Sequence, residues 1–174
     1  DLREEEVRPR LEALVDALFQ GVPSGVGSKG KIIIDPPEEM DQVLTGGAEW
    51  AVAQGFGAPE DLTVTEEGGR IPEAAPSTVG SRARQRGAPQ MGTLGSGNHF
   101  LEVQMVDEVY DVKVAERFGI TGAGQITVMI HCGSRGLGHQ VCIDYIKVAE
   151  GAAQRHGIRL PDRQLAAAPI KSRE

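Results

Sequence analysis

The chain has 174 residues, of which 40% are hydrophobic and 25% are charged, a composition typical of one globular domain with a sizeable core. A net charge of −7 and an aromatic content of 4% argue against a strongly basic nucleic-acid surface or a platform of stacked aromatic rings. Two cysteines, Cys132 and Cys142, are too few for a disulfide framework, and no apolar run approaches the ~20 residues of a membrane span. Since no signal peptide is evident, we expect a cytoplasmic protein with no membrane contact, in which both thiols are small core residues.

The first third of the chain predicts two helices with a short strand between them. Residues 1–22 form an amphipathic pattern with apolar side chains three and four positions apart, and Asp1 and Glu4 resemble a capping box. Residues 31–34 predict a short strand, and residues 40–54 predict a helix weakened by paired glycines.

After a long loop at about 55–80, the remaining segments alternate between helices and strands. They are a short helix at 77–86, a strand at 100–106, a helix at 112–118, a buried apolar strand at 125–132, and a helix at 138–155 that Gly157 caps. This alternation favours the α/β class with α+β layering, a mixed sheet with packed helices, in a single domain over residues 1–174.

A glycine-rich segment at residues 25–31 (GVGSKGK) resembles the loops that bind dinucleotides and nucleoside triphosphates. Those loops follow a strand and open a helix, whereas this segment follows a predicted helix and precedes a predicted strand. Ile32 also stands where a phosphate loop has a hydroxyl side chain for Mg²⁺. We therefore interpret the segment as a flexible connection.

His131 lies at the end of the predicted buried strand, where ligands bind in α/β sheets. A glycine-rich turn over 133–138 follows, and then a helix begins. Free N–H groups, the positive end of a helix and an arginine together favour a bound anion, so Ser134 and Arg135 are candidate contacts for phosphate or RNA. A core histidine followed by a tight turn explains the same residues equally well.

A second histidine, His99, lies where another glycine-rich loop enters a strand, and neutral imidazole is a common metal ligand. In an extended strand Asn98, Phe100 and Glu102 face one way, while His99 and Leu101 face the other. The amide of Asn98 is able to donate to a phosphate oxygen, and the carboxylate of Glu102 is able to accept from a guanine-type N–H edge. The alternative for Glu102 is an ordinary carboxylate on a strand surface.

Three arginines, Arg82, Arg84 and Arg86, occupy alternate positions of the predicted helix at 77–86. Their spacing spreads them around the helix, which favours a solvated face, and the alternative is contact with RNA phosphates.

The chain resembles RtcB-type RNA ligases, the tRNA-splicing ligase family, in the stretches GTLGSGNHFLEVQ and HCGSRGLGHQV and in flanks that include GGAEWAV, EEGGR and ARQRGAPQM. The resemblance implies an RtcB-like fold and an RNA ligase that depends on GTP and two Mn²⁺ ions. Such enzymes join RNA ending in a 2′,3′-cyclic phosphate or 3′-phosphate to RNA with a 5′-hydroxyl, in tRNA splicing or RNA repair. By similarity, His99 would bind one Mn²⁺ ion and His131 the other. The expected contacts to the guanine nucleotide are Asn98, His99, Phe100, Leu101 and Glu102.

The resemblance also implies residues that this sequence lacks, among them an Asp-x-x-Cys metal motif and the histidine nucleophile. We therefore expect a central segment of a longer ligase, without a catalytic residue of its own and inactive when isolated. Two alternatives are a metal-dependent phosphoesterase built on the same histidines and a noncatalytic module that binds nucleotide or RNA.

Overall fold

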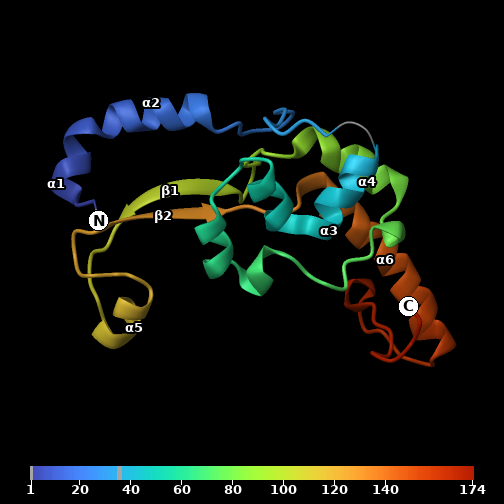
Figure 1. Cartoon of the computed structure of the whole chain (residues 1–174). Coiled ribbons are helices and arrows are strands. Elements are labelled where there is room, and N and C mark those ends of the chain that lie inside the picture. The colour runs from blue at the N-terminus through green and yellow to red at the C-terminus, as the bar shows by residue number, and fades with distance from the viewer. Residues whose placement is uncertain (1, 35–36) are drawn as a thin grey trace. The chain divides into compact units, whose positions relative to one another are not determined.

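The computed structural model describes residues 2–34 and 37–174, and the chain divides into two compact units (Figure 1). The first unit holds the residues up to Lys31 together with Gly92–Gly133, and the second holds Ile32–Met91 with Ser134–Glu174. The prediction of one domain over residues 1–174 stays a prediction.

The first unit contains an antiparallel pair of strands, β1 (Phe100–Met105) and β2 (Ile126–His131). The register pairs Phe100 with His131 at one end and Met105 with Ile126 at the other. Because side chains alternate along a strand, the pair presents two different faces. One face carries Leu101, Val103, Val128 and Ile130, and the other carries Phe100, Glu102, Met129 and His131.

The predicted N-terminal helix is confirmed, but it forms in three pieces, α1 (Glu4–Val7), the 3-10 turn η1 (Arg8–Arg10) and α2 (Leu11–Gly21). Pro9 lacks a backbone N–H and its ring disturbs the preceding turn, which explains the break. Asp1 of the expected capping box lies outside the described residues.

Helix α2 runs along the sheet, and its apolar stripe lies over β1 (Figure 1). Leucines of α2 and the side chains of Leu101 and Val103 line a cavity of about 320 Å³. The short helix α5 (Val112–Arg117) belongs to the same unit, and the side chain of Asp111 caps it by accepting from Val114 N–H at 3.1 Å.

The predicted strand at 125–132 is confirmed, but the expected burial is wrong. Val128 and Ile130 are each 61% exposed and Met129 is 44% exposed. An apolar strand is buried only where other elements cover both of its faces, and the strand side chains that line the cavity below α2, Leu101 and Val103, belong to β1.

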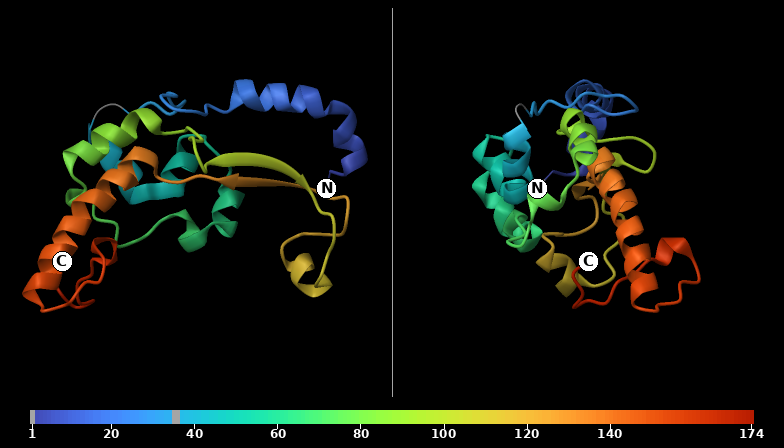
Figure 2. Two further views of the ribbon diagram at one scale, coloured as in Figure 1. Left: turned by 180° about the vertical axis from the view of Figure 1, so that it is seen from behind. Right: turned by 90° about the vertical axis from the view of Figure 1, so that its right-hand side faces the viewer.

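The second unit is helical. Its elements are α3 (Pro37–Ala53), η2 (Pro59–Val64), η3 (Glu66–Gly69), η4 (Pro76–Thr78), α4 (Ser81–Gly87), η5 (Ala88–Gln90), α6 (Arg135–Arg155) and η6 (Arg163–Leu165). Helices α4 and α6 pack side by side (Figure 2). Their approach is close because Gly87 has no side chain, and a Cβ there would lie 2.8 Å from Leu137 Cβ.

Three other expectations change in the structure. Residues 31–34 form no strand, because a run of four residues needs a neighbouring strand to supply its hydrogen bonds. The predicted loop at 55–80 contains the three 3-10 turns η2, η3 and η4. Helix α6 begins three residues earlier than predicted, at Arg135, so the glycine-rich turn becomes its first turn.

The predicted class of mixed helices and strands is confirmed. The sheet of the described residues is a single antiparallel pair of strands. Two isolated β-bridges lie outside it, an antiparallel one between Arg3 and Gln125 and a parallel one between Ser24 and Gly95. No helix within residues 2–34 and 37–174 has both the length and the apolar character needed to span a bilayer.

Candidate metal and phosphate site

The two histidines singled out in the sequence lie together in the first unit. His99 directly precedes β1 and His131 ends β2, and the register of the strands brings these ends side by side. The centroids of the two imidazole rings are 5.9 Å apart, with 47° between the ring planes. The ring of Phe100 meets His131 edge-on at a centroid distance of 5.3 Å.

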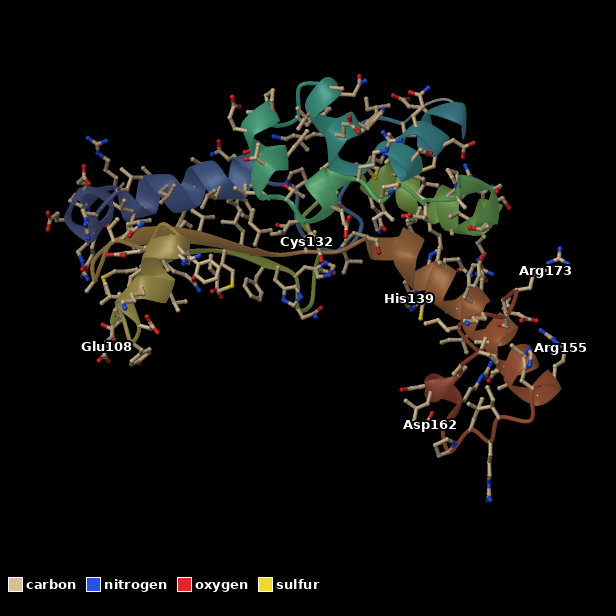
Figure 3. The ribbon with its side chains drawn as sticks, turned by 60° about the horizontal axis from the view of Figure 1, so that its bottom comes forward. Glu108, Cys132, His139, Arg155, Asp162 and Arg173 are labelled. Carbon is tan, nitrogen blue, oxygen red and sulfur yellow. The ribbon has the colours of Figure 1, made fainter. Side chains whose placement is uncertain are left out.

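Contacts between the flanking loops hold this end of the sheet. The thiol of Cys132, at the C-terminal end of β2 (Figure 3), donates to the carbonyl oxygen of Leu94 at 2.8 Å. Gly133 follows, and a Cβ at this position would lie 3.7 Å from Nε2 of His99. The segment after β2 therefore lies directly against the loop that carries His99.

Both cysteines differ from the sequence-based expectation, because both are exposed. Cys132 lies at the open end of the strand pair, where its thiol makes a hydrogen bond instead of filling a core. Cys142 lies on α6, on a part of the helix that no other element covers enough to bury it.

The glycine-rich segment at 25–31 makes hydrogen bonds with neighbouring parts of the first unit. Gly25 N–H donates to Gly95 O at 2.7 Å, and Leu94 N–H donates to Pro23 O at 2.9 Å. The ammonium group of Lys31 donates to Gly21 O at 2.6 Å, at the C-terminal end of α2. The start of the segment is thus bound to the loop that precedes His99.

The imidazole of His99 has an unsatisfied atom. Its Nδ1 is buried and makes no hydrogen bond with the described residues, whereas His131 is exposed. An unsatisfied buried polar atom costs about 1–3 kcal/mol, and a metal ion is one partner that would satisfy an imidazole nitrogen. The donor chemistry of His99 therefore fits a metal ion.

Two imidazoles alone are too few for a tight site. In residues 2–34 and 37–174, no three His, Cys, Asp or Glu side chains gather in a way that could hold a metal ion. Metal sites in proteins take three or four ligands from the chain, so further donors would have to complete this one.

The other predicted nucleotide contacts divide between the two faces of β1. Phe100 and Glu102 share a face with His131, and the exposed Glu102 accepts from Gln104 Nε2 at 2.8 Å. Asn98 is exposed in the preceding turn. Leu101 lines the cavity below α2, so only its backbone is available to a ligand on the His131 face.

The strict alternation predicted for 98–102 does not extend to His99. His99 and Phe100 are neighbours in the chain, yet the rings of both lie near the ring of His131. His99 precedes the strand, where the backbone is not bound by the two-residue period.

The predicted phosphate residues lie at the start of α6 in the second unit. Ser134 is the N-cap residue and is exposed, and its hydroxyl makes no capping hydrogen bond. Arg135 has a φ of +53°, in the left-handed region that non-glycine residues rarely adopt, and its Nε is buried without a partner among the described residues. Within the described part of the chain, a hydroxyl that makes no capping bond, a guanidinium Nε without a partner and a 21-residue helix that begins here together favour an anion.

Two glycines of this turn lie close to neighbouring groups. A Cβ at Gly136 would lie 2.7 Å from Gln90 Oε1 and 3.1 Å from Arg86 O, and a Cβ at Gly138 would overlap Ser134 Oγ. The glycine spacing therefore reflects close approach of neighbouring groups at the helix start.

The three arginines of α4 differ in their contacts. Arg84 forms an ion pair with Asp41 and donates to two backbone carbonyls, and Arg86 donates to Gln140 Oε1 at 2.9 Å. Arg82 is exposed and makes no hydrogen bond or ion pair with the described part of the chain. Arg84 and Arg86 therefore bind other elements of the second unit, and Arg82 stays available for a ligand.

A cavity of about 580 Å³ also lies in the second unit, beside α3 and η3, and carries Glu66, Glu67 and Glu73 on its walls. None of the sequence-predicted site residues lines it. The sequence did not indicate the contacts of Cys132 and Gln90. Cys132 bonds to Leu94 in the loop before His99, and Gln90 bonds to Gly136 in the turn after His131. Both contacts join residues that are far apart in the chain, so no local pattern reveals them.

Paired imidazoles at one end of a small sheet, and an open helix start with an unsatisfied arginine, are features of proteins that bind metal ions and phosphate groups. The comparison with known families is more specific. The whole chain, residues 1–174, matches the family described as tRNA-splicing ligase RtcB, and the chain belongs to this family.

Curated relatives with that name support the assignment. The chain is 55% identical over 174 residues to the one from Archaeoglobus fulgidus, covering 100% of this chain and 36% of the relative. It is 53% identical over 174 residues to the one from Pyrococcus furiosus, covering 100% of this chain and 18% of the relative. It is 52% identical over 173 residues to the one from Pyrobaculum aerophilum, covering 99% of this chain and 36% of the relative. The chain thus spans about a third or less of the length of these relatives.

Proposed function

We propose that this chain is part of an RNA ligase that uses GTP and two Mn²⁺ ions to join RNA with a 2′,3′-cyclic phosphate or 3′-phosphate to RNA with a 5′-hydroxyl. Family membership supports the ligase class, and the observation that carries the site is the 5.9 Å separation of the rings of His99 and His131. The partners are RNA, from tRNA splicing or RNA repair, and GTP, and the place of action is the cytoplasm.

His99 and His131 are the metal ligands of this proposal. Paired ions in phosphoryl-transfer sites lie about 3.5–4 Å apart, so rings 5.9 Å apart suit one imidazole on each of two ions. Bound Mn²⁺ would neutralise charge that develops on a phosphoryl group and would orient the reacting oxygens. The ring of Phe100 limits the motion of His131 through its edge-on contact.

The nucleotide would lie on the His131 face of β1. Glu102 would accept from the N–H edge of guanine, and the exposed Asn98 would donate to a phosphate oxygen. His99, Phe100 and the backbone of Leu101 complete this surface.

The RNA phosphate would bind at the start of α6. The Ser134 hydroxyl, the guanidinium of Arg135 and the N–H groups of the first turn supply the donors, and the exposed Arg82 adds a cation on α4. The reaction itself needs a histidine outside these residues, which takes GMP from GTP and passes it to the RNA 3′-phosphate before the 5′-hydroxyl displaces GMP.

The test is covalent labelling of the full-length parent protein with radioactive GTP in the presence of Mn²⁺. We expect His99→Ala and His131→Ala each to reduce labelling by at least about 100-fold, a loss seen when metal-site groups are removed, with little change in melting temperature. The matched control is His156→Ala, because His156 is exposed at the far end of α6.

Wild-type labelling by either histidine variant would remove that residue from the site. Hydrolysis of a phosphoester by the wild-type protein without GTP would favour the phosphoesterase. RNA binding that survives a chelator, with no labelling at all, would favour the noncatalytic module.

A further inference from the structure

A glutamine of η5 contacts the first turn of α6. The side-chain oxygen Oε1 of Gln90 accepts from the backbone N–H of Gly136 at 2.7 Å. This N–H belongs to the free donors at the helix start, which have no acceptor within the helix. Gly136 permits the approach, because a Cβ there would lie 2.7 Å from the same oxygen.

The contact lies one residue after an unusual backbone conformation. Arg135 has a φ of +53°, and such a conformation persists only where the surrounding structure holds it. The bond from Gly136 to Gln90 fixes the peptide that follows Arg135, and so it fixes the direction in which the arginine side chain leaves the backbone.

A second contact braces the same helix one turn further along. Arg86 Nη1 donates to Gln140 Oε1 at 2.9 Å, and Gln140 Nε2 donates to Asp144 Oδ1 at 2.9 Å. With α6 held there, a change at Gln90 would alter the helix start without releasing the whole helix from α4.

The chemistry of the amide matters as much as its place. A glutamine oxygen satisfies the N–H of Gly136 without adding a charge, and it leaves the positive end of the helix open to an anion. A carboxylate would make the same hydrogen bond, but its negative charge would repel a phosphate at this place.

We propose that Gln90 is a positioning residue for the phosphate of the RNA 3′ end. It holds the start of α6 and the backbone of Arg135 in place, and it does so as a neutral acceptor. This inference rests on the proposed phosphate role of Arg135.

The experiment measures kcat and KM for the RNA strand with a 3′-phosphate, and the melting temperature, in the full-length parent. Its variants are Gln90→Glu, Gln90→Ala, Arg135→Ala and the double variant of Gln90→Ala with Arg135→Ala. We expect Gln90→Glu to keep the wild-type melting temperature and to raise KM about fivefold, because a charge at a helix N-terminus has an effect of this size. Gln90→Ala should raise KM and also lower the melting temperature, since it leaves the Gly136 N–H without its acceptor.

In the Arg135→Ala background, the effect of Gln90→Ala on KM should fall below about twofold, because Gln90 acts through the position of Arg135. Tyr145→Phe is the matched control. It removes another neutral hydrogen bond of α6, from Tyr145 Oη to Thr78 O at 3.1 Å, and should leave KM unchanged.

An unchanged KM in Gln90→Ala would overturn the positioning role of Gln90, as would an undiminished effect of Gln90→Ala in the Arg135→Ala background. An unchanged KM in Gln90→Glu would overturn its role as a neutral acceptor. A wild-type KM in Arg135→Ala would instead contradict the proposed contact between Arg135 and the phosphate, on which the inference rests.

Discussion

At the scale of single residues, the two segments that carry the histidine pair are joined by a neighbouring side chain. Cys132 directly follows His131, and its thiol reaches back to the carbonyl of Leu94, in the loop that leads to His99. One side chain thus connects the two segments that carry the imidazoles.

Replacement of Cys132 tests this connection. We expect Cys132→Ala to slow labelling of the full-length parent with GTP by about fivefold, since a lost hydrogen bond of about 1 kcal/mol loosens both histidines. Cys132→Ser keeps a donor and should recover most of the rate, and Cys142→Ala, which replaces the other exposed thiol, should retain it fully.

Equal rates for the alanine and serine variants of Cys132 would show that the hydrogen bond does not position the histidines. The arginines of α4 illustrate the same dependence on neighbours, because Arg84 and Arg86 are occupied by Asp41, backbone carbonyls and Gln140. Their spacing in the sequence carries no sign of these partners.

At the scale of secondary-structure elements, α3 is interrupted by a contact with η3. Gly47 lies inside α3 with φ 54° and ψ −133°, and a Cβ there would overlap the carbonyl oxygen of Gly69. Arg70 and Glu49 form an ion pair at 3.3 Å beside this contact. The segment that the sequence predicted as a loop is therefore held against the helix.

Gly47→Ala should destabilise the protein by about 3 kcal/mol or more, because a positive φ strains alanine and the new methyl group overlaps the backbone of η3. Gly55→Ala is the matched control, since Gly55 also has a positive φ, +84°, but no atom near its Cβ position. Urea unfolding of the two variants separates these causes, and equal losses would show that overlap at Gly47 contributes nothing.

The start of α6 shows how an element boundary escapes prediction. Glycine is a poor helix former, so the sequence predicts a turn up to residue 138 and a helix after it. Gln90 and the close approach at Gly136 override that preference and extend the helix back to Arg135.

At the scale of the whole molecule, the first unit leaves much apolar surface uncovered. Phe19 is 83% exposed, and Val128 and Ile130 are each 61% exposed on one face of a sheet of two strands. Two strands with an open apolar face have little stability of their own. The curated relatives are about three times as long as this chain or longer, so their additional residues are available to cover such surfaces.

The 174-residue segment expressed by itself should therefore bind a hydrophobic dye strongly, unfold without a sharp transition and show no labelling with GTP. The full-length parent should bind little dye and unfold cooperatively. Fluorescence and calorimetry on both proteins make the comparison, and a sharp transition with weak dye binding by the segment would contradict the expectation.

The sequence by itself determined the kinds of element, the two histidine blocks and the family, because periodicity, strand composition and long motifs are properties of neighbouring residues. Two glycine-rich loops, each next to a histidine and an apolar strand, were enough to select His99 and His131. The helix over residues 40–54 and the strand over 100–106 followed from local pattern in the same way.

Only the tertiary structure decided that the two imidazoles meet, that residues 31–34 form no strand, and which arginine of α4 stays unoccupied. Each of these depends on a partner far away in the chain, such as His131 opposite Phe100 or Asp41 beside Arg84. Hydrogen bonds and packing contacts act over a few ångströms in space, whatever the separation of the two residues along the chain. A local sequence pattern therefore does not reveal which distant residues will be in contact.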